Sequence, residues 1–175
     1  MINLNKYLIV VDMQRDFITG SLANKDAQDI VENVCNKIKE FDGLIIATYD
    51  THTTEYLNTQ EGKYLPVEHC IKDTDGWRIN SDVMNALCTK CFSTIHKPTF
   101  GYLGWKDHII NPSEIHVIGI CTDICVISNV TILKAMFPET KIIVHANCCA
   151  GVTSESHKTA LAAMKMMQVE VVENE

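Results

Sequence analysis

The sequence predicts an α/β fold of three layers (α/β/α, Rossmann-like), in which helices cover both faces of a six-stranded parallel sheet. Two observations predict it. Short apolar runs alternate with helix-like segments along the 175 residues. Several of these runs are continuously apolar, as is typical of strands buried on both faces of a parallel sheet. The length fits one domain over residues 1–175, and an apolar content of 46% is enough for a compact core.

The N-terminal half of the chain begins this alternation of strands and helices. The first predicted strand is the apolar run Tyr7–Val11, which ends in Asp12. A loop follows, and then a predicted helix over about Lys25–Phe41. The second strand, Leu44–Tyr49, leads into a long irregular segment, Thr51–Ile79. Such a long segment without regular structure is usually functional in a compact domain.

The C-terminal half continues the same alternation. A short predicted helix at Asn80–Leu87 precedes a third strand at Phe92–His96. The remaining predicted elements, alternately strand and helix, are Ile115–Ile120, Val126–Met136, Lys141–Ala146, Ser154–Met167 and Val169–Val172. The last of these helices is rich in Ala and Met at core-like spacing. No linker, repeat or low-complexity segment interrupts the pattern.

A cysteine follows the fourth predicted strand at a chemically favourable place. The strand ends in a short polar turn, and Cys125 closes this turn where the next helix begins. A helix N-terminus carries partial positive charge and free backbone N–H groups. These features lower the pKa of a thiol and offer donors to an oxyanion. The local sequence therefore fits a nucleophilic cysteine, and it fits a buried, unreactive cysteine equally well.

Two further polar residues follow apolar strands. Asp12 comes directly after the first strand, and Lys97 comes directly after the third. Ligands bind outside the carboxyl ends of the strands in open parallel sheets. We therefore expect Asp12, Lys97 and Cys125 to converge on one crevice as base, cation and nucleophile. Taken singly, Asp12 also suits a cap or turn, and Lys97 suits a solvated surface.

Three motifs contain these residues. Residues 12–17 read Asp-Met-Gln-Arg-Asp-Phe, residues 96–100 read His-Lys-Pro-Thr-Phe, and residues 119–126 read Gly-Ile-Cys-Thr-Asp-Ile-Cys-Val. They resemble, in this order, the opening motif, the lysine motif and the nucleophile turn of the isochorismatase-like cysteine hydrolases. The matches follow the family's order and span nearly the whole chain. The first motif alone is weak, whereas all three at these spacings are a strong signal.

The resemblance implies a mechanism. Cys125 would be the nucleophile, Asp12 the general base and acid, and Lys97 the cation that keeps both groups ionised. The backbone N–H groups of Cys121 and Cys125 would form the oxyanion hole, and the peptide between Ile120 and Cys121 would be cis. The implied reaction is hydrolysis of a small amide through a thioester on Cys125, with release of ammonia.

A second set of residues resembles the nicotinamidase branch of this family. Asp50 and His52 follow the second strand, where side chains two residues apart point the same way. His69 follows later, in the sequence Leu-Pro-Val-Glu-His-Cys. Nicotinamidases bind a divalent metal through such an Asp-x-His pair and a later histidine, and some add an acidic group, matched here by Glu61. Imidazole and carboxylate ligands suit Zn, Fe or Mn.

The sequence departs from the nicotinamidase pattern beside His69. Nicotinamidases usually have an aromatic residue before the proline and one residue between the proline and the histidine. This chain has Leu65 before the proline and two residues after it, which would either displace His69 or bulge the loop. Phe17 and Phe100 still match aromatic pocket positions. The expected substrate pocket therefore includes Phe17, Leu65 and Phe100, and the departures bear on nicotinamide as the substrate rather than on amide hydrolysis.

Two other functions are compatible with the sequence. One is an isochorismatase-family hydrolase of another small amide, carbamoyl or ureido group without a metal requirement. Asp50 and His52 would then bind substrate or have no role. The other is a non-enzymatic binding or scaffold protein. A charged pair facing a thiol argues against that function, because packing does not demand it.

Charge and composition restrict the partners. A net charge of -7 with scattered Lys and Arg argues against binding of nucleic acid. No apolar stretch approaches the roughly 20 residues that span a bilayer, and the N-terminus does not read as a signal peptide. We expect a cytoplasmic protein in which the eight cysteines are thiols. The expected partners are a small-molecule amide and, because members of the family often self-associate, a homo-oligomer.

Three other positions carry weaker expectations. The Cys148-Cys149 pair follows the fifth predicted strand and is expected to pack near the mouth of the site. His116 lies near the start of a strand, away from the carboxyl ends, and is expected at the surface. His157 lies near the N-terminus of the last helix, from which it could face the crevice.

Overall fold

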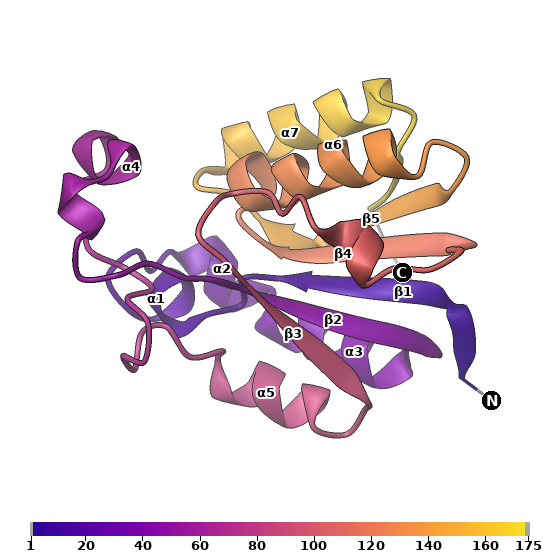
Figure 1. Ribbon diagram of the computed structural model, residues 1–175, viewed down its shortest axis with the longest axis horizontal. Coiled ribbons are helices and arrows are strands. Elements are labelled where there is room, and N and C mark those ends of the chain that lie inside the picture. Colours follow the sequence, from indigo (N-terminus) through magenta and orange to yellow (C-terminus); the bar gives the residue numbers. More distant parts are fainter. Residues whose placement is uncertain (1, 174–175) are drawn as a thin grey trace.

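The computed structural model describes residues 2–173 of the chain. A single sheet forms the central layer, and helices pack on both of its faces (Figure 1). Its six strands, each parallel to its neighbours, are β1 (Asn3–Val11), β2 (Gly43–Asp50), β3 (Phe92–Lys97), β4 (Glu114–Ile120), β5 (Lys141–Ala150) and β6 (Glu170–Val172). This architecture confirms the predicted fold class.

The order of the strands places a crevice at one edge of the sheet. The order is β3-β2-β1-β4-β5-β6, so the chain starts at the centre, moves outward through β2 and β3, and returns to the other side of β1. β1 and β4 are hydrogen-bonded neighbours, with Tyr7 opposite Ile115 and Val11 opposite Gly119. The connections leave these two strands in opposite directions, which opens a crevice at their carboxyl ends.

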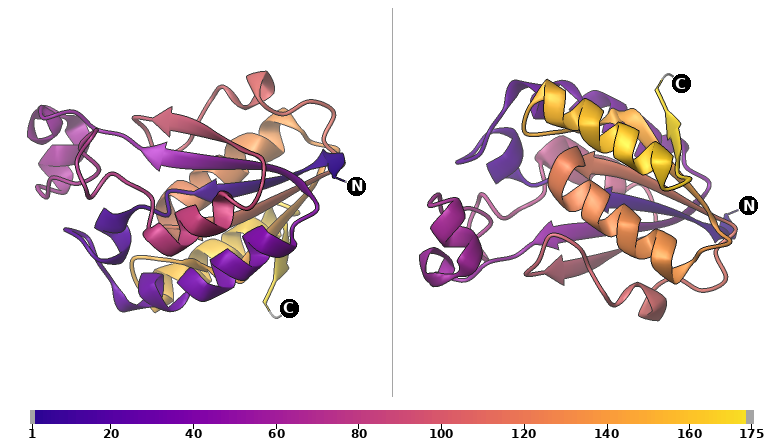
Figure 2. Two further views of the ribbon diagram at one scale, coloured as in Figure 1. Left: turned by 90° about the horizontal axis from the view of Figure 1, so that it is seen from below. Right: turned by 90° about the horizontal axis from the view of Figure 1, so that it is seen from above.

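The helices divide between the two faces of the sheet, except the helix Gln60–Tyr64, which projects beyond the end of the sheet (Figure 1 and Figure 2). They are α1 (Arg15–Ile18), α2 (Lys25–Asp29), α3 (Val31–Glu40), α4 (Gln60–Tyr64), α5 (Ser81–Leu87), α6 (Ile127–Met136) and α7 (Ser154–Met166). Leu8 and Val10 of β1 pack with α1, α2, α3 and α5, whereas Ile9 and Val11 pack with α6 and α7. This alternation follows from the two-residue period of a strand. No helix in the described part of the chain is long and apolar enough to cross a membrane.

The structure differs from the predicted elements at several boundaries. Ile30 separates α2 from α3 within the helix predicted over residues 25–41. The segment 51–79, predicted to be irregular, contains α4 and a short 3-10 helix, Tyr56–Asn58. The helix predicted to begin at Val126 begins at Ile127, because the turn before it, Thr122–Val126, is wound as a π-helix.

Two expectations about residues outside the crevice are wrong. Cys148 and Cys149 do not lie past the end of β5, because this strand continues to Ala150 and buries them in the cores on opposite faces of the sheet. His116 is not at the surface. Its Nδ1 lies 2.8 Å from Nε2 of His145, and the ring of Phe41 packs against it at 5.1 Å between centroids. The start of β4 is therefore covered even though it is far from the crevice.

Candidate active site

Asp12 and Lys97 meet in a buried ion pair at the carboxyl ends of β1 and β3. Nζ of Lys97 lies 2.6 Å from Oδ2 of Asp12, and both side chains are fully buried. Thr48 on β2 donates a hydrogen bond of 2.6 Å to Oδ1 of Asp12, and Lys97 donates one of 3.1 Å to the carbonyl of Thr99. Two charges are costly to bury unless they are paired and hydrogen-bonded, as they are here. The pair is part of the buried interior. Asp12 is therefore not merely a cap or turn residue, and Lys97 is not on the solvated surface.

The surroundings of this pair shift the pKa of both residues upward. Burial raises the pKa of Asp12, and the charge of Lys97 opposes the increase. Burial lowers the pKa of Lys97, but the negative charges of Asp12 and Cys125 outweigh it and raise the pKa overall. Lys97 therefore stays protonated. A carboxyl group with a raised pKa is closer to the value at which it can both accept and return a proton.

Cys125 lies in the π-helical turn between β4 and α6. Its side chain is 5% exposed and lines the cavity described below. Burial raises the pKa of its thiol well above the usual value, and Lys97 only partly opposes the shift. The expectation of a lowered pKa at a helix N-terminus is therefore wrong, because desolvation outweighs the favourable charges. The thiol at rest is neutral and needs a proton acceptor to become a nucleophile.

The backbone before Cys125 has the shape that the resemblance implies. The peptide bond between Ile120 and Cys121 is cis. The carbonyl of Cys121 accepts hydrogen bonds from the N–H groups of Ile124 (3.1 Å) and Val126 (2.9 Å), which closes the turn. Just before it, Gly119 has φ 122°, and a Cβ there would overlap the backbone of β1. Only glycine permits this approach of the two strands.

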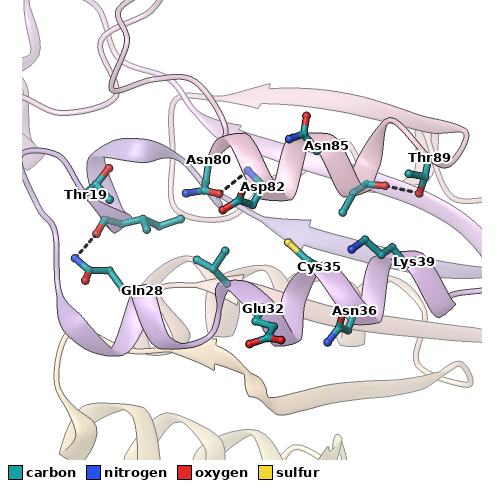
Figure 3. Close-up of a pocket in the computed structure, with 13 residues that line it drawn as sticks. Thr19, Gln28, Glu32, Cys35, Asn36, Lys39, Asn80, Asp82, Asn85 and Thr89 are labelled. Atoms are coloured by element: carbon teal, nitrogen blue, oxygen red, sulfur yellow. Dashed lines mark hydrogen bonds between the residues drawn. The ribbon is translucent and has the colours of Figure 1, made fainter.

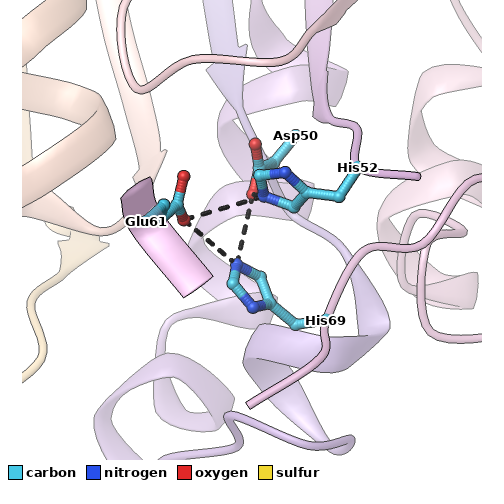
Figure 4. A group of neighbouring side chains, drawn as sticks. All are labelled: Asp50, His52, Glu61 and His69. Carbon is cyan, nitrogen blue, oxygen red and sulfur yellow. Dashed lines mark hydrogen bonds and ion pairs between the residues drawn. The ribbon is translucent and has the colours of Figure 1, made fainter. Parts of the chain in front are cut away.

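Four ligand-type side chains converge beside the end of β2 (Figure 4). Oδ2 of Asp50 lies 3.0 Å from Nε2 of His52 and 3.5 Å from Nε2 of His69. Oε1 of Glu61, on α4, lies 3.7 Å and 3.6 Å from the same two nitrogens. These four atoms all lie within 4.8 Å of one another. We call these residues the ligand cluster. The extra residue before His69 does not carry its imidazole away.

Backbone pairing brings His69 to this place. The N–H of His52 donates to the carbonyl of Cys70 (3.0 Å), and the N–H of Lys72 donates to the carbonyl of His52 (2.9 Å), so residues 70–72 run beside the end of β2. Nδ1 of His69 lies 2.8 Å from the carbonyl of Val67, which leaves Nε2 facing the other ligands. A second nitrogen held by a carbonyl is the usual arrangement of a metal-binding histidine. The residues therefore fit a divalent cation.

The charges of the ligand cluster already support one another. Burial lowers the pKa of His69, but hydrogen bonds to Asp50 and Glu61 outweigh it and raise the pKa to about 10. Burial raises the pKa of Asp50, but hydrogen bonds from His52 and His69 outweigh it and lower the pKa. The carboxylates thus favour positive charge at this point. A bound cation would take the place of the imidazole protons.

One cavity of about 860 Å³ brings the thiol and the ligand cluster together. Cys121 and Cys125 line it, and so do Asp50, Glu61 and His69. The three predicted pocket residues, Phe17, Leu65 and Phe100, also line it. Most of the remaining lining is apolar, and no Lys or Arg of the described chain is part of it. The cavity therefore suits a neutral, flat or apolar molecule.

Sequence reasoning missed two polar residues, the buried Gln14 and the half-buried Asp16, that hold the ligand cluster in place. Oε1 of Gln14 accepts a hydrogen bond from the N–H of Asp50, and Nε2 donates to the carbonyls of Asp50 and Trp77, all at 2.8 Å. Oδ2 of Asp16 accepts one of 2.8 Å from the N–H of Cys70, next to His69. The available signal was their place in the 12–17 motif, at alternate positions after Asp12.

Two other features lie outside this cavity. His157 is not among its lining residues, and its Nδ1 instead lies 2.8 Å from the hydroxyl of Thr122 in the π-helical turn. A second cavity, of about 820 Å³, lies between α3 and α5 and is lined by polar side chains that include Asn36, Asn80 and Asp82 (Figure 3). No predicted site residue lines this second cavity.

Comparison with known proteins identifies the family. The family model described as the isochorismatase domain matches residues 6–175. The chain belongs to this family. Within the isochorismatase family, an uncharacterised protein named PncA from Bacillus subtilis is 28% identical over 178 residues, which cover 91% of this chain and 93% of that protein. The nicotinamidase of Saccharomyces cerevisiae is 25% identical over 171 residues, which cover 69% of this chain and 77% of that protein.

Solved structures support the isochorismatase fold. The crystal structure of the nicotinamidase PncA from Bacillus subtilis matches with a TM-score of 0.83 at 22% identity, over 97% of this chain and 100% of that one. A pyrazinamidase of Pyrococcus horikoshii in complex with zinc matches with a TM-score of 0.74 at 24% identity, over 97% of this chain and 99% of that one. At these identities the likeness concerns the fold alone.

Proposed function

We propose that the protein is a metal-binding cysteine amidohydrolase that converts nicotinamide and water into nicotinate and ammonia. Membership of the isochorismatase family and the likeness to a nicotinamidase indicate a hydrolase that acts on an amide bond. One observation carries the finer proposal. A single cavity is lined by the Cys125 thiol and by Asp50, Glu61 and His69 of the ligand cluster. A nucleophile and a set of metal ligands thus face the same cavity, where both can act on one substrate molecule.

Asp12 and Lys97 activate the thiol in this proposal. Asp12 accepts the proton of Cys125, and the resulting thiolate attacks the amide carbonyl carbon. Lys97 keeps Asp12 ionised and therefore free to accept a proton, and its positive charge also lowers the pKa of Cys125, which favours the thiolate. The buried ion pair thus replaces the helix N-terminus as the source of activation. The proton then passes from Asp12 to the amide nitrogen as the C–N bond breaks, so that ammonia leaves.

The backbone of the nucleophile turn stabilises the charge that develops. The N–H groups of Cys121 and Cys125 donate to the tetrahedral oxyanion, and losing one such donor costs about 3–4 kcal/mol in comparable sites. Departure of ammonia leaves a thioester on Cys125. Water then attacks the thioester carbonyl, Asp12 accepts its proton, and the proton returns to the departing thiolate.

The ligand cluster would hold the metal ion. Asp50, His52, Glu61 and His69 supply two imidazoles and two carboxylates, which suit Zn, Fe or Mn. When bound, such an ion supplies a Lewis acid that can bind the ring nitrogen of the substrate or orient water. An aromatic side chain lies beside the ligand cluster. Phe17 lies against His69, with 5.6 Å between the ring centroids, and presents an aromatic wall to the cavity.

The lining of the cavity favours a neutral substrate. No Lys or Arg of the described residues faces it, and Lys97, whose charge acts on the thiol, is fully buried against Asp12. Within the described chain, no lysine or arginine is therefore placed to pair with an anionic substrate. The mainly apolar lining suits a neutral heteroaromatic amide.

Leu65 favours a second candidate function. It lines the cavity at the place where nicotinamidases have an aromatic residue, so the wall lacks one stacking partner for a flat ring. The second candidate is a hydrolase of another small amide, carbamoyl or ureido group that works without a metal. Asp50 and His52 would then contact the substrate directly.

Ammonia release across a panel of small amides tests the proposal. We expect nicotinamide and pyrazinamide to be hydrolysed, and a chelator such as dipicolinate to abolish this activity until Zn, Fe or Mn is restored. Simple ureas and carbamates, which lack the ring, should be poor substrates. Turnover of ureido or carbamoyl compounds alone, unaffected by chelation, would support the second candidate.

Removing one ligand should empty the metal site. We expect His69→Ala and Asp50→Ala to lower the bound metal, measured by elemental analysis, to a small fraction of one ion per chain. Fewer ligands hold an ion poorly against water and buffer. His108→Ala is the matched control, because His108 is an exposed histidine outside the ligand cluster and should keep the metal. Full metal content in His69→Ala, or full activity of metal-free protein, would contradict the metal assignment.

The hydrogen bonds of Gln14 should matter for metal affinity. Gln14→Leu keeps the volume but removes three hydrogen bonds, two of which fix the backbone of Asp50. Loss of a group that orients a ligand typically weakens metal binding by about 10–100-fold. Competition with a chromophoric chelator measures this change. Gln28→Leu is the control, since Gln28 also bonds a backbone carbonyl, that of Ile18, but away from the ligand cluster. Equal metal affinity in the two variants would show that Asp50 is held by other means.

A further inference from the structure

The cavity that contains the thiol is also lined by apolar side chains from segments other than those of the ligand cluster. Leu22 comes from the loop between α1 and α2, Ile124 from the π-helical turn, and Val152 from the loop after β5, and all three line the cavity with Cys125. The two loops lie side by side, because Nδ2 of Asn24 donates to the carbonyl of Gly151 (3.3 Å). We call Leu22, Ile124 and Val152 the outer chamber.

The side chains of the outer chamber are apolar, and the polar groups described beside them are engaged elsewhere. Asn24 is the polar side chain beside it, and both ends of its amide are engaged. Its Oδ1 accepts from the N–H of Ala27 (2.7 Å), and its Nδ2 bonds Gly151. The N–H of Val152 donates to the Asp123 carboxylate at 3.1 and 3.2 Å. A ligand group placed here therefore gains from burial and not from hydrogen bonds.

The size of the cavity exceeds the needs of a single ring. Its volume of about 860 Å³ lies in the upper part of the range found for pockets that enclose drug-sized ligands. A six-membered ring with one carboxamide fills only part of such a space. In nicotinamide the ring nitrogen, the carbon that bears the carboxamide and the carbon C5 are every second atom of the ring. If the carboxamide lies at Cys125 and the ring nitrogen points toward the ligand cluster, C5 is directed away from both.

We propose that the preferred substrate is a heteroaromatic carboxamide with an apolar substituent at C5, and that the outer chamber binds this substituent. The inference rests on the proposed function and leaves its reaction unchanged. It adds a specificity site, made by Leu22, Ile124 and Val152, that nicotinamide itself does not occupy. A charged substituent would find no side chain of opposite charge among these residues. An alkyl or aryl group of a few carbons matches their chemistry.

A pair of substrates tests this specificity. The rate of ammonia release, as kcat/KM, is measured for nicotinamide and for 5-butylnicotinamide with the metal-loaded protein. Complete burial of one CH₂ group is worth about fourfold in affinity, so partial burial of the butyl chain should favour the substituted amide by about tenfold or more. We expect this advantage to lie mainly in KM, because the substituent is far from the reacting bond.

Two variants connect the advantage to the outer chamber. Leu22→Gln and Val152→Gln place a polar amide in it and should reduce the advantage of 5-butylnicotinamide to about threefold or less. Val152 is 54% exposed, so this substitution should not disturb folding. Met166→Gln is the matched control, because Met166 is an 88% exposed apolar residue on α7 outside the cavity and should keep the full advantage.

The results separate this inference from the proposed function. If nicotinamide is hydrolysed and 5-butylnicotinamide is equal or worse, the outer chamber does not bind the substituent and the inference is overturned, while the proposed function stands. If neither amide is hydrolysed, the proposed function fails. Calorimetric titration of both amides into Cys125→Ala then decides about the chamber without turnover. Binding of 5-butylnicotinamide about tenfold tighter than that of nicotinamide supports it, and equal or weaker binding overturns it.

Discussion

Replacing Cys125 by alanine should abolish amide hydrolysis and leave the protein folded. The substitution removes the atom that attacks the amide carbonyl in the proposed mechanism, so turnover should fall by about 10⁴-fold or more. It deletes a single buried sulfur atom, and the midpoint of thermal unfolding should change little. Ammonia release and calorimetric unfolding measure the two effects. An acyl adduct trapped by rapid acid quench should appear by mass spectrometry in the wild type and be missing in the variant.

Cys121→Ala is the matched control for this experiment. Cys121 lines the same cavity, but its proposed contribution is made by its backbone N–H, and its carbonyl closes the π-helical turn. Alanine keeps these backbone groups, so substantial activity should remain. An inactive Cys121→Ala together with an active Cys125→Ala would show that the nucleophile has been assigned to the wrong cysteine.

Asp12→Asn should lower the rate of hydrolysis by a factor of at least about a hundred, which is the usual effect of losing a general acid and base. Asparagine has nearly the same shape and can still contact Thr48, but it cannot take up the thiol proton. It also leaves Lys97 as a buried charge without its partner, which can cost about 3–5 kcal/mol of stability. The rate must therefore be measured on protein shown to be folded by circular dichroism at the assay temperature.

The two members of the ion pair should act on the thiol in opposite directions. Lys97 lowers the pKa of Cys125 and Asp12 raises it. At a fixed pH below this pKa, Lys97→Met should reduce the thiolate fraction and slow alkylation of Cys125 by iodoacetamide. Asp12→Asn should speed it, although turnover falls in both variants. Unchanged alkylation rates in both would mean that neither charge influences the thiol, and the proposed triad would be wrong.

The fold and the meeting of distant residues could be predicted because both depend on repeating patterns. Buried strands read as apolar runs, and parallel strands bring their carboxyl ends to one edge. Asp12, Lys97 and Cys125 are therefore expected at this edge from their positions, and Asp50 from the resemblance to nicotinamidases. The structure places Asp12 against Lys97 and Asp50 in the ligand cluster. Their chemical roles remain predictions that the substitutions above test.

What the sequence could not reveal depends on the paths of loops and on depth of burial. Gln14 bonds the backbone of Asp50, and such a contact depends on the course of the loop after β1 rather than on residue type. The pKa of Cys125 depends on how much of the fold covers the turn, which no local pattern records. His116 was misjudged for the same reason, because Phe41 and His145 cover the start of β4.

The loop after β1 has a consequence for how the chain can change in length during evolution or engineering. Asp12 and Gln14 lie in this loop and Asp16 lies in the first turn of α1. These alternate residues contact Lys97, the backbone of Asp50 and the backbone beside His69, respectively. Inserting or deleting one residue between positions 12 and 16 would put at least one of these contacts out of register. The stretch before His69 already carries an additional residue and still delivers the imidazole to the ligand cluster. Insertions should therefore be tolerated just before His69 and excluded from residues 12–16.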